Sequence, residues 1–231
     1  MPACWFGVDR STITRAIGEV RPLLAERGCT VSPDVRLRTL AEAVDHLGAS
    51  GTTGIIGGTE IRVRRPAVGR EDRDKFVSGK NKQNAVKTMV GTDGDGRMLF
   101  CSPTRPGSCA DITHARQLEL VKLLADGPAV EILADAGYQG LRAQTGGRVV
   151  TPPHRKFKKN APDWHEEGYE RQRKAHSSWC IRAEHGSAHL KNWRAPTRHL
   201  GRREHISDVV QAVTGLLSHQ QTADLTSARQ T

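Results

Sequence analysis

The sequence predicts a mixed α/β fold in which helices flank a sheet of antiparallel and parallel strands. Three strand-like segments follow one another at residues 54–66, 84–92 and 97–104, and a turn with Asp-Gly pairs joins the last two. Helical and strand patterns then alternate through residues 106–153. Strands that first come in a row and then alternate with helices are typical of a mixed sheet with helices packed on it.

The N-terminal part contains one amphipathic helical pattern. Between residues 5 and 28, apolar side chains recur at spacings of four, three and four, with Ser11 as the expected N-cap and Gly28 as the stop. A tight turn at residues 6–8 followed by Ser-Thr-x-x-Arg is how many helix-turn-helix recognition helices begin. Few residues precede this turn, so we expect either a truncated helix-turn-helix-like segment or a lone packing helix.

Two groups of polar and basic residues are candidates for contacts with DNA phosphates or base edges. The first group opens the N-terminal helix and consists of Arg10, Ser11, Thr12, Thr14 and Arg15. The second forms two basic segments, although such runs are also common in solvated loops; its members are Lys75, Lys80, Lys82 and Lys87, and then Arg155, Lys156, Lys158 and Lys159.

The remaining elements follow in order. Pro33 and Gly48 frame a short helix that leads into the main domain. In the first strand, Ile61 and Val63 alternate with arginines, and Pro66 ends it. Asp93 and Asp95 are expected to be hairpin-turn residues. The second half of the sequence predicts a helix at 106–127, a buried strand at 129–135 and a further strand at 148–153. The polar, basic segment at 154–174 is expected to be a mobile loop or the start of an exposed helix, and helices are expected at 176–193 and 205–219.

This order of strands and helices is that of an RNase H-like domain. We expect three parts: a truncated helix-turn-helix-like DNA-binding segment at 1–48, the RNase H-like domain at 49–219 and a disordered tail at 220–231.

Composition limits the class of protein. Lys and Arg total 35 and Asp and Glu total 25, a formal net charge of +10. Such a charge favours a polyanionic partner, most simply nucleic acid, but a merely soluble basic protein would look the same. Five cysteines without a CxxC pair suggest a reducing cytoplasm rather than a disulfide framework. No signal peptide or membrane span is expected.

Two acids stand where metal-dependent chemistry would need them. Asp135 follows the apolar strand AVEILA, which would place it at the mouth of a sheet, although a turn or helix N-cap would explain it equally. Glu184 lies in a helical pattern with Lys191 seven residues later on the same side. An acid that binds metal beside a cation that holds phosphate suits phosphodiester cleavage, whereas an ordinary solvated helix face is the alternative.

Five blocks in order resemble the motif series of DDE-superfamily transposases, most closely the bacterial insertion-sequence branch related to Harbinger elements. The blocks are GGTEIRVRRP, SGKNKQNAVKTMV, PGSCAD, LADAGYQG and RAEHGSAHLKNW, and the resemblance covers roughly residues 5–215. Each block alone is weak, but five in order are specific. The family's second and third acids fall on Asp135 and Glu184, and its basic partner falls on Lys191.

The chain departs from this pattern at the first acid, because an Asp-Gly-Thr block is replaced by one with Gly57. Glu60 would lie on the opposite face of the strand unless a bulge intervenes. Asp111 resembles a further acid of the family, yet we expect it to cap the helix that follows. A zinc site formed by His176, Cys180, His185 and His189 is conceivable, although its spacing matches no established zinc motif.

The resemblance implies a transposase that uses Mg²⁺ or Mn²⁺, with Asp135 and Glu184 as catalytic metal ligands. Its partners would be double-stranded DNA at element ends and targets, bound by a homo-oligomer in the cytoplasm near the bacterial nucleoid. Loss of one acid at Gly57 predicts impaired strand cleavage and transfer. The alternative is a non-catalytic DNA-binding relic of a transposase.

Overall fold

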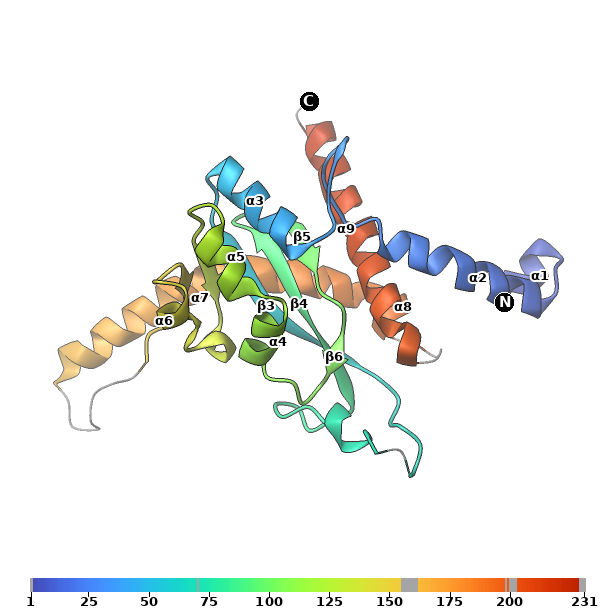
Figure 1. The fold of residues 1–231 in the computed structure, drawn as a ribbon, viewed down its shortest axis with the longest axis horizontal. Helices are drawn as coiled ribbons and strands as arrows, with labels where there is room; N and C mark the ends of the chain where they lie inside the picture. The colour runs from blue at the N-terminus through green and yellow to red at the C-terminus, as the bar shows by residue number, and fades with distance from the viewer. Residues whose placement is uncertain (1, 70, 155–161, 198, 200–202, 229–231) are drawn as a thin grey trace.

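The fold is described from a computed structural model of the 231-residue chain. The structure describes residues 2–69, 71–154, 162–197, 199 and 203–228. A twisted sheet forms the centre, with one group of helices in front and long helices behind and beside it (Figure 1). Among the described residues, no helix combines the length and the apolar composition needed to cross a membrane.

The central sheet has six strands in the order β5-β4-β3-β7-β8, and the short β6 pairs with β4. β3 is antiparallel to β4 and parallel to β7, and β7 is parallel to β8. The mixed α/β class with flanking helices, consistent with an RNase H-like domain, is therefore confirmed. The strands are β3 (Gly54–Arg62), β4 (Ala85–Asp93), β5 (Met98–Cys101), β6 (Arg105–Pro106), β7 (Ile132–Ala134) and β8 (Val149–Val150).

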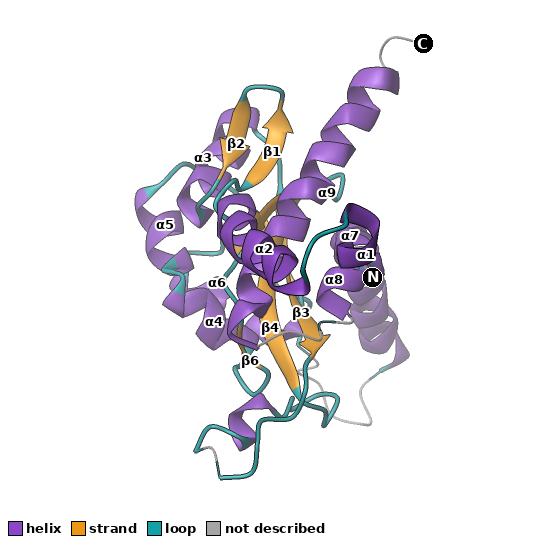
Figure 2. Cartoon of the chain, turned by 90° about the vertical axis from the view of Figure 1, so that its right-hand side faces the viewer, coloured by secondary structure: helices purple, strands orange, loops and turns teal. Residues whose placement is uncertain are grey.

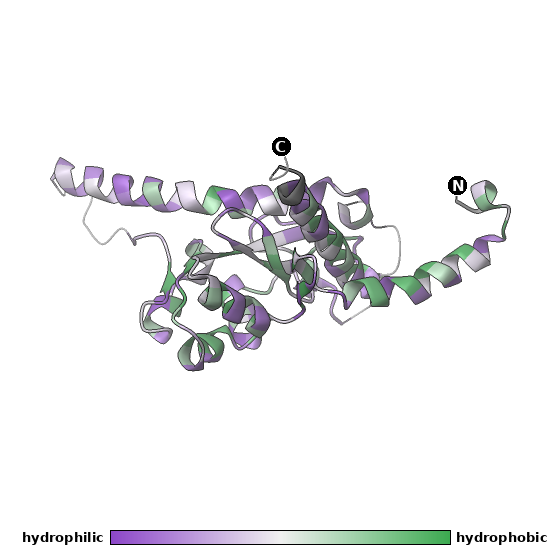
Figure 3. Ribbon diagram, turned by 90° about the horizontal axis from the view of Figure 1, so that it is seen from above, coloured by the Kyte–Doolittle hydropathy of each residue, from purple (hydrophilic) through white to green (hydrophobic). Residues whose placement is uncertain are grey.

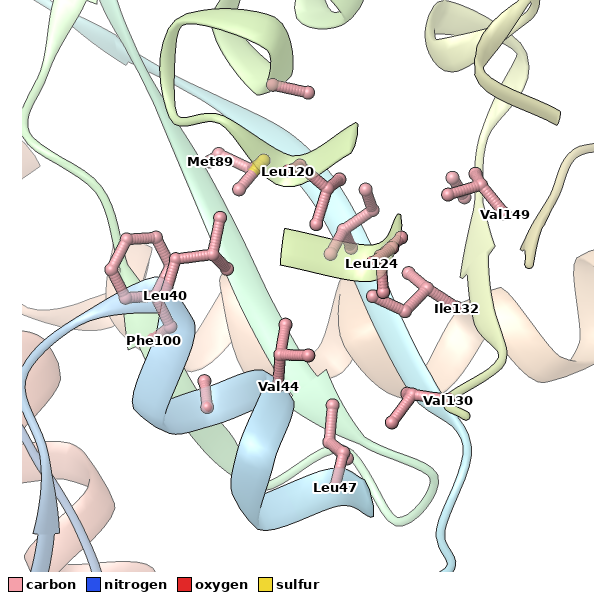
Figure 4. Close-up of a cluster of buried hydrophobic side chains, with 14 of the residues drawn as sticks. Leu40, Val44, Leu47, Met89, Phe100, Leu120, Leu124, Val130, Ile132 and Val149 are labelled. Carbon is pink, nitrogen blue, oxygen red and sulfur yellow. The ribbon is translucent and has the colours of Figure 1, made fainter. Parts of the chain in front are cut away.

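The front face of the sheet is covered by α3 (Leu40–Ser50), α4 (Asp111–Gln117) and α5 (Leu120–Asp126). α3 begins with a capping box, in which the Thr39 and Glu42 side chains each accept a hydrogen bond from the other's backbone. Its apolar face meets that of α5 above the strands, in a core that includes Val44, Leu124 and Ile132 (Figure 4). This packing holds the ends of β3 and β7 in register.

The back face is covered by the 30-residue helix α7 (Asp163–Asn192) and by α9 (Ile206–Ala228). Leu190 of α7 and Val210 of α9 are fully buried in a second core against β3, β4 and β5. α8 (Arg194–Thr197) and a short 3-10 helix, η3 (Arg203–His205), lie between them in the chain. Three smaller elements complete the domain, η1 (Asp74–Phe76), η2 (Ala136–Tyr138) and α6 (Leu141–Gln144).

The N-terminal part is tied to the end of the chain. A hairpin of β1 (Cys29–Ser32) and β2 (Val35–Leu37) lies beside α9 (Figure 2). The Thr30 backbone N–H donates to Ser218 Oγ at 2.8 Å, and Thr222 Oγ1 donates to the Thr30 carbonyl at 3.0 Å. α9 therefore extends through residues 220–228, where the sequence predicted that a disordered tail begins.

The helices α1 (Pro2–Phe6) and α2 (Arg10–Ala25) project away from the sheet (Figure 3). α2 contains no buried residue, so the apolar stripe expected to pack is largely exposed. Its N-cap is Asp9, which accepts a hydrogen bond from the Ser11 backbone N–H at 2.7 Å, so the expectation that Ser11 caps the helix is wrong. Asp is as good a cap as Ser, and it lies two residues earlier.

Three further differences from the expected elements have local causes. The helix expected at 106–127 is two helices, because Glu119 adopts a left-handed backbone with φ 57°. α7 begins at Asp163, so the later part of the polar segment is the exposed start of a helix rather than a loop, since Pro162 precedes it and acids occupy its first turn. The boundary expected after residue 48 falls inside α3, whose apolar side chains belong to the central core.

Candidate functional site

Gly57 in β3 and Asp135 just after β7 lie side by side, at the point where the parallel pairing of the two strands ends. The last parallel pair of β3 and β7 is Ile56 with Ala134, and each of the two residues follows one position later. Ile55 and Leu133 face α7, where they form a small core with Ala183. Because side chains alternate along a strand, positions 57 and 135 face α7 as well.

Asp135 caps the short helix η2, because its Oδ1 accepts a hydrogen bond from the Gly137 backbone N–H at 2.8 Å. Desolvation by the surrounding protein raises the pKa of this carboxyl, although the residue keeps contact with solvent. The hydrogen bond from Gly137 lowers the pKa, and the negative charge of Asp111 raises it. The position of Asp135 is thus compatible both with capping η2 and with forming part of an acidic site.

Glu184 and Asp135 approach the same thiol. Cys180 lies on α7 one turn before Glu184, in the small core that contains Ile55 and Leu133. Desolvation raises the pKa of Cys180 to about 11, and the negative charges of Asp135 and Glu184 both contribute to the rise. The strand end and the exposed side of α7 therefore present their two acids to one region.

The space beside Gly57, on the side where its side chain would lie, is open. A Cβ atom built on Gly57 meets nothing within 4 Å, and the backbone is not left-handed there. A Cβ atom on the next residue, Gly58, would lie 2.3 Å from Asp111 Oδ1. An acid would fit at 57, but glycine supplies no ligand, and no group of three or more His, Cys, Asp or Glu in the described residues can hold a metal.

Behind the strand lies a charged network that the sequence did not reveal. Lys87 Nζ is 3.1 Å from Asp111 Oδ1 and 3.8 Å from Glu60 Oε1. Glu60 also accepts hydrogen bonds of 2.8 Å from Ser78 Oγ and Asn81 Nδ2. The prediction that Glu60 faces away from position 57 is confirmed, because β3 pairs with β4 without a bulge.

Asp111 does not cap a helix, so that expectation is wrong. It is the first residue of α4 rather than the residue before it, and Ala110 at the N-cap makes no side-chain hydrogen bond. Its carboxylate instead lies close to the backbone of Gly58 and Gly137. A Cβ on Gly58 would lie 2.3 Å from Asp111 Oδ1, and a Cβ on Gly137 would lie 2.5 Å from Asp111 Oδ2. Glycine at positions 58 and 137 is the sequence signal for this close approach, because a side chain at either position would meet Asp111.

The basic candidates divide into three groups. Lys80 and Lys82 are exposed, and the charge of Lys80 lowers the pKa of Asp135, so it lies near the acids. Lys191 is exposed on α7, two turns beyond Glu184. Lys87 is largely buried and paired, so the expectation that it tracks DNA is wrong.

The other predicted contacts are distributed elsewhere. Lys75 is paired with Asp72, and the run at 155–159 lies outside the described residues. Arg10, Ser11, Thr12, Thr14 and Arg15 lie at the start of the projecting helix α2, away from the acids. His176 hydrogen-bonds the Ala134 carbonyl at 2.9 Å and lies 3.5 Å from Cys180 Sγ, an arrangement that connects α7 to β7. Asp93 accepts bonds from the Asp95 and Arg97 backbone, which confirms its place in the hairpin turn.

A family model described as DDE superfamily endonuclease matches residues 56–218, well over half of the chain. The chain belongs to this family. The match begins in β3 and ends in α9, so it includes Gly57, Asp135 and Glu184. No curated protein and no solved structure matches the chain. Members of the DDE superfamily normally act on DNA and use divalent metal ions, and the present domain is a transposase-like nuclease domain in its family and fold.

Proposed function

We propose that this DDE superfamily endonuclease is a transposase of a bacterial insertion sequence, from the Harbinger-related branch, whose strand cleavage and transfer are impaired by Gly57. In this proposal Asp135 and Glu184 are the two remaining catalytic ligands for a divalent ion, Mg²⁺ or Mn²⁺. The observation that carries it is the open position at Gly57, which lies beside Asp135 on the face covered by α7. In this proposal the site is a three-acid site from which the acid at position 57 has been lost.

The residues present do not fit a complete metal cage. Two-metal phosphoryl transfer needs several carboxylates that converge on the ions. Here two acids approach Cys180, while the side of β3 next to Asp135 offers only a glycine. Asp111 lies near Asp135, since a Cβ on Gly137 would meet the carboxylates of both, but in this proposal it does not replace the missing ligand because its charge is balanced by Lys87. What the chain's own residues retain is the ability to hold DNA near the acids through Lys80, Lys82 and Lys191.

The partners under this proposal are double-stranded DNA at element ends and targets, bound by a homo-oligomer in the bacterial cytoplasm near the nucleoid. The N-terminal residues Arg10–Arg15 would add contacts with element ends from the projecting helix α2. A second candidate is favoured by the glycine itself: a non-catalytic DNA-binding relic that occupies element ends without cutting them.

The test is nicking of supercoiled DNA in the presence of Mn²⁺ by the natural chain and by Gly57→Asp. We expect Gly57→Asp to nick and the natural chain to nick far less, with activity lost again when Asp135→Ala is added. Gly168→Asp is the matched control, because a Cβ there also meets nothing within 4 Å and the position lies on α7. Equal activity of all variants, or cutting that survives Asp135→Ala, would refute the proposed site.

The two candidates differ in one further measurement. A relic that acts only by binding would prefer element-end duplexes to random duplexes in a mobility-shift titration, and Gly57→Asp would leave that preference unchanged. A Gly57→Asp variant that binds element ends without cutting them favours the relic.

A further inference from the structure

We propose that a basic groove beyond the acids is a track for the phosphate backbone of duplex DNA. The groove has a volume of about 1000 Å³ and lies between the end of β3, the segment before β4 and the region of α8. Five cations line it, namely Arg62, Arg64, Arg65, Lys82 and Arg194, and none of its described lining residues is acidic. Five positive charges without an acid favour a polyanion.

These five cations are unpaired, unlike several basic side chains on and around the sheet. Arg97 pairs with Asp93, Arg182 with Asp95, and Lys87 with Glu60 and Asp111. Within the part of the chain that the structure describes, none of the five groove cations makes an ion pair. Their charge is therefore available to a ligand from solution.

The backbone presents these side chains in a defined way. Arg62 and Arg64 flank Val63, which is buried in the second core, and the Val63 backbone N–H donates to the Asn84 carbonyl at 2.9 Å. Because side chains alternate in extended chain, anchoring Val63 directs both arginines away from the core. Lys82 is exposed, and its backbone is left-handed with φ 52°, a conformation that residues other than glycine seldom adopt.

The groove lies in line with the acids. β3 carries the chain from Gly57 to Arg62, about 16 Å at the usual rise of a strand. The helical segments from Glu184 to Arg194 span about 15 Å at the rise of an α-helix. The two elements run in the same direction, because Ile55 packs with Ala183 and Ile61 shares a core with Leu190.

This spacing suggests how much DNA would be engaged. Duplex DNA advances about 3.4 Å per base pair, so a phosphate at the acids and phosphates over the groove would be about five base pairs apart. A free phosphate ion would neutralise only part of the five charges. The inference rests on the proposed function only in placing DNA across the acids, since binding in the groove requires no cleavage.

The experiment compares two full-length variants, each of which removes four positive charges. The groove variant carries Arg62→Gln, Arg64→Gln, Arg65→Gln and Arg194→Gln. The matched control carries substitutions of exposed cations elsewhere, Arg36→Gln, Arg38→Gln, Lys122→Gln and Arg142→Gln. Binding of a fluorescent random duplex of two helical turns is measured by anisotropy over a series of KCl concentrations, and circular dichroism checks that both variants fold.

The logarithm of the association constant for DNA falls as the logarithm of the salt concentration rises. We expect this dependence to be shallower by about two to four in the groove variant, since each lost phosphate contact removes about 0.9 from the magnitude of the slope. Its affinity should fall at least tenfold below that of the control variant, whose slope should stay near that of the natural chain. Equal slopes and affinities for the two variants would overturn the groove. Stronger competition by duplex RNA than by duplex DNA would overturn it too, because the partner would then be RNA.

The outcomes also separate this inference from the proposed function. If Gly57→Asp nicks DNA while the two charge variants bind alike, the nuclease site stands and the groove fails. If the groove variant loses DNA while Gly57→Asp never nicks, the groove stands and the proposed cleavage fails. If the natural chain does not bind DNA, the proposal that the groove binds DNA is wrong. The nicking assay with Gly57→Asp still tests the proposed acidic site independently.

Discussion

Lys87 and Asp111 form an ion pair of 3.1 Å in which both side chains are largely buried, with 12% and 20% of their surfaces exposed. Lys87 also faces Glu60, so one cation balances two carboxylates on the side of β3 opposite Gly57. The pair joins β4 to the start of α4, and Asp111 in turn contacts the turn that follows Asp135. The ion pairs of Lys87 thus help to position Asp135 at the end of β7.

Replacing Lys87 with methionine should destabilise the domain strongly. Two carboxylates would lose the cation that pairs with both of them in a largely buried place, and the expected loss in the free energy of unfolding is about 3 kcal/mol. Urea denaturation followed by circular dichroism measures this. Lys75→Met is the matched control, because its pair with Asp72 is exposed and screening by solvent should leave it with little effect on stability. Similar losses for the two variants would contradict the central role of Lys87.

Adding a methyl group should destabilise the fold at Gly58 and have little effect on stability at Gly57. Gly58→Ala would push the Asp111 carboxylate away from Lys87 and should lower the free energy of unfolding by about 1–3 kcal/mol. Gly57→Ala meets open space and should leave stability within about 1 kcal/mol of the natural value, since alanine also restricts the unfolded chain. Thermal denaturation of both variants decides this, and a larger loss for Gly57→Ala would show that position 57 is not open.

The reactivity of Cys180 should report the approach of the two acids. Its pKa of about 11 keeps the thiol protonated at pH 8, so alkylation by iodoacetamide should be slow. Removing the charges with Asp135→Asn and Glu184→Gln should lower the pKa and speed alkylation a few-fold at fixed pH, although desolvation keeps the value raised. Mass spectrometry of the peptide that contains Cys180 gives the rate.

Glu170→Gln is the control for that measurement, because Glu170 lies on α7 two to three turns before Cys180. It should leave the rate unchanged. Identical rates in the double variant and the control would mean that Asp135 and Glu184 do not converge on the thiol.

Lys82→Gly should stabilise the fold and weaken DNA binding at the same time. The left-handed backbone at Lys82 strains a residue with a Cβ, and glycine relieves this strain by up to about 1 kcal/mol. The lost positive charge should reduce the affinity for duplex DNA and the dependence of binding on salt. Thermal denaturation and anisotropy measure the two effects.

Glu119→Gly provides the comparison, since Glu119 has the same type of backbone, with φ 57°, in the junction of α4 and α5. It should stabilise the fold similarly without weakening DNA binding. A loss of stability in Lys82→Gly would show that the lysine is favoured there for the fold rather than for a ligand.

The sequence predicted the central strands, the place of Asp135 and the orientation of Glu60, because these follow from alternation of apolar residues along single segments. It did not predict the β1–β2 hairpin. The hairpin depends on hydrogen bonds between Thr30 and residues of α9 that are nearly the whole chain away. Local pattern carries no information on such a contact, and the same limit applies to the disordered tail that was expected there.

Charge was the least predictable part of the site. A lysine that alternates with apolar residues in a strand looks exposed, and only the packing of α4 on β4 reveals that Lys87 is enclosed between Glu60 and Asp111. The groove cations posed the opposite problem. Arg62 and Arg64 were recognised as the polar side of a strand, but their neighbours Lys82 and Arg194 come from segments that only the fold brings together.

The open space beside Gly57 has an evolutionary consequence. Because a Cβ atom at position 57 would meet nothing within 4 Å, the fold leaves room for aspartate there. A glycine codon of the form GGC or GGT becomes an aspartate codon by one base substitution. Under the proposed function, loss and recovery of an acid at position 57 are therefore single genetic steps, and the open space means that neither step requires a second mutation to make room.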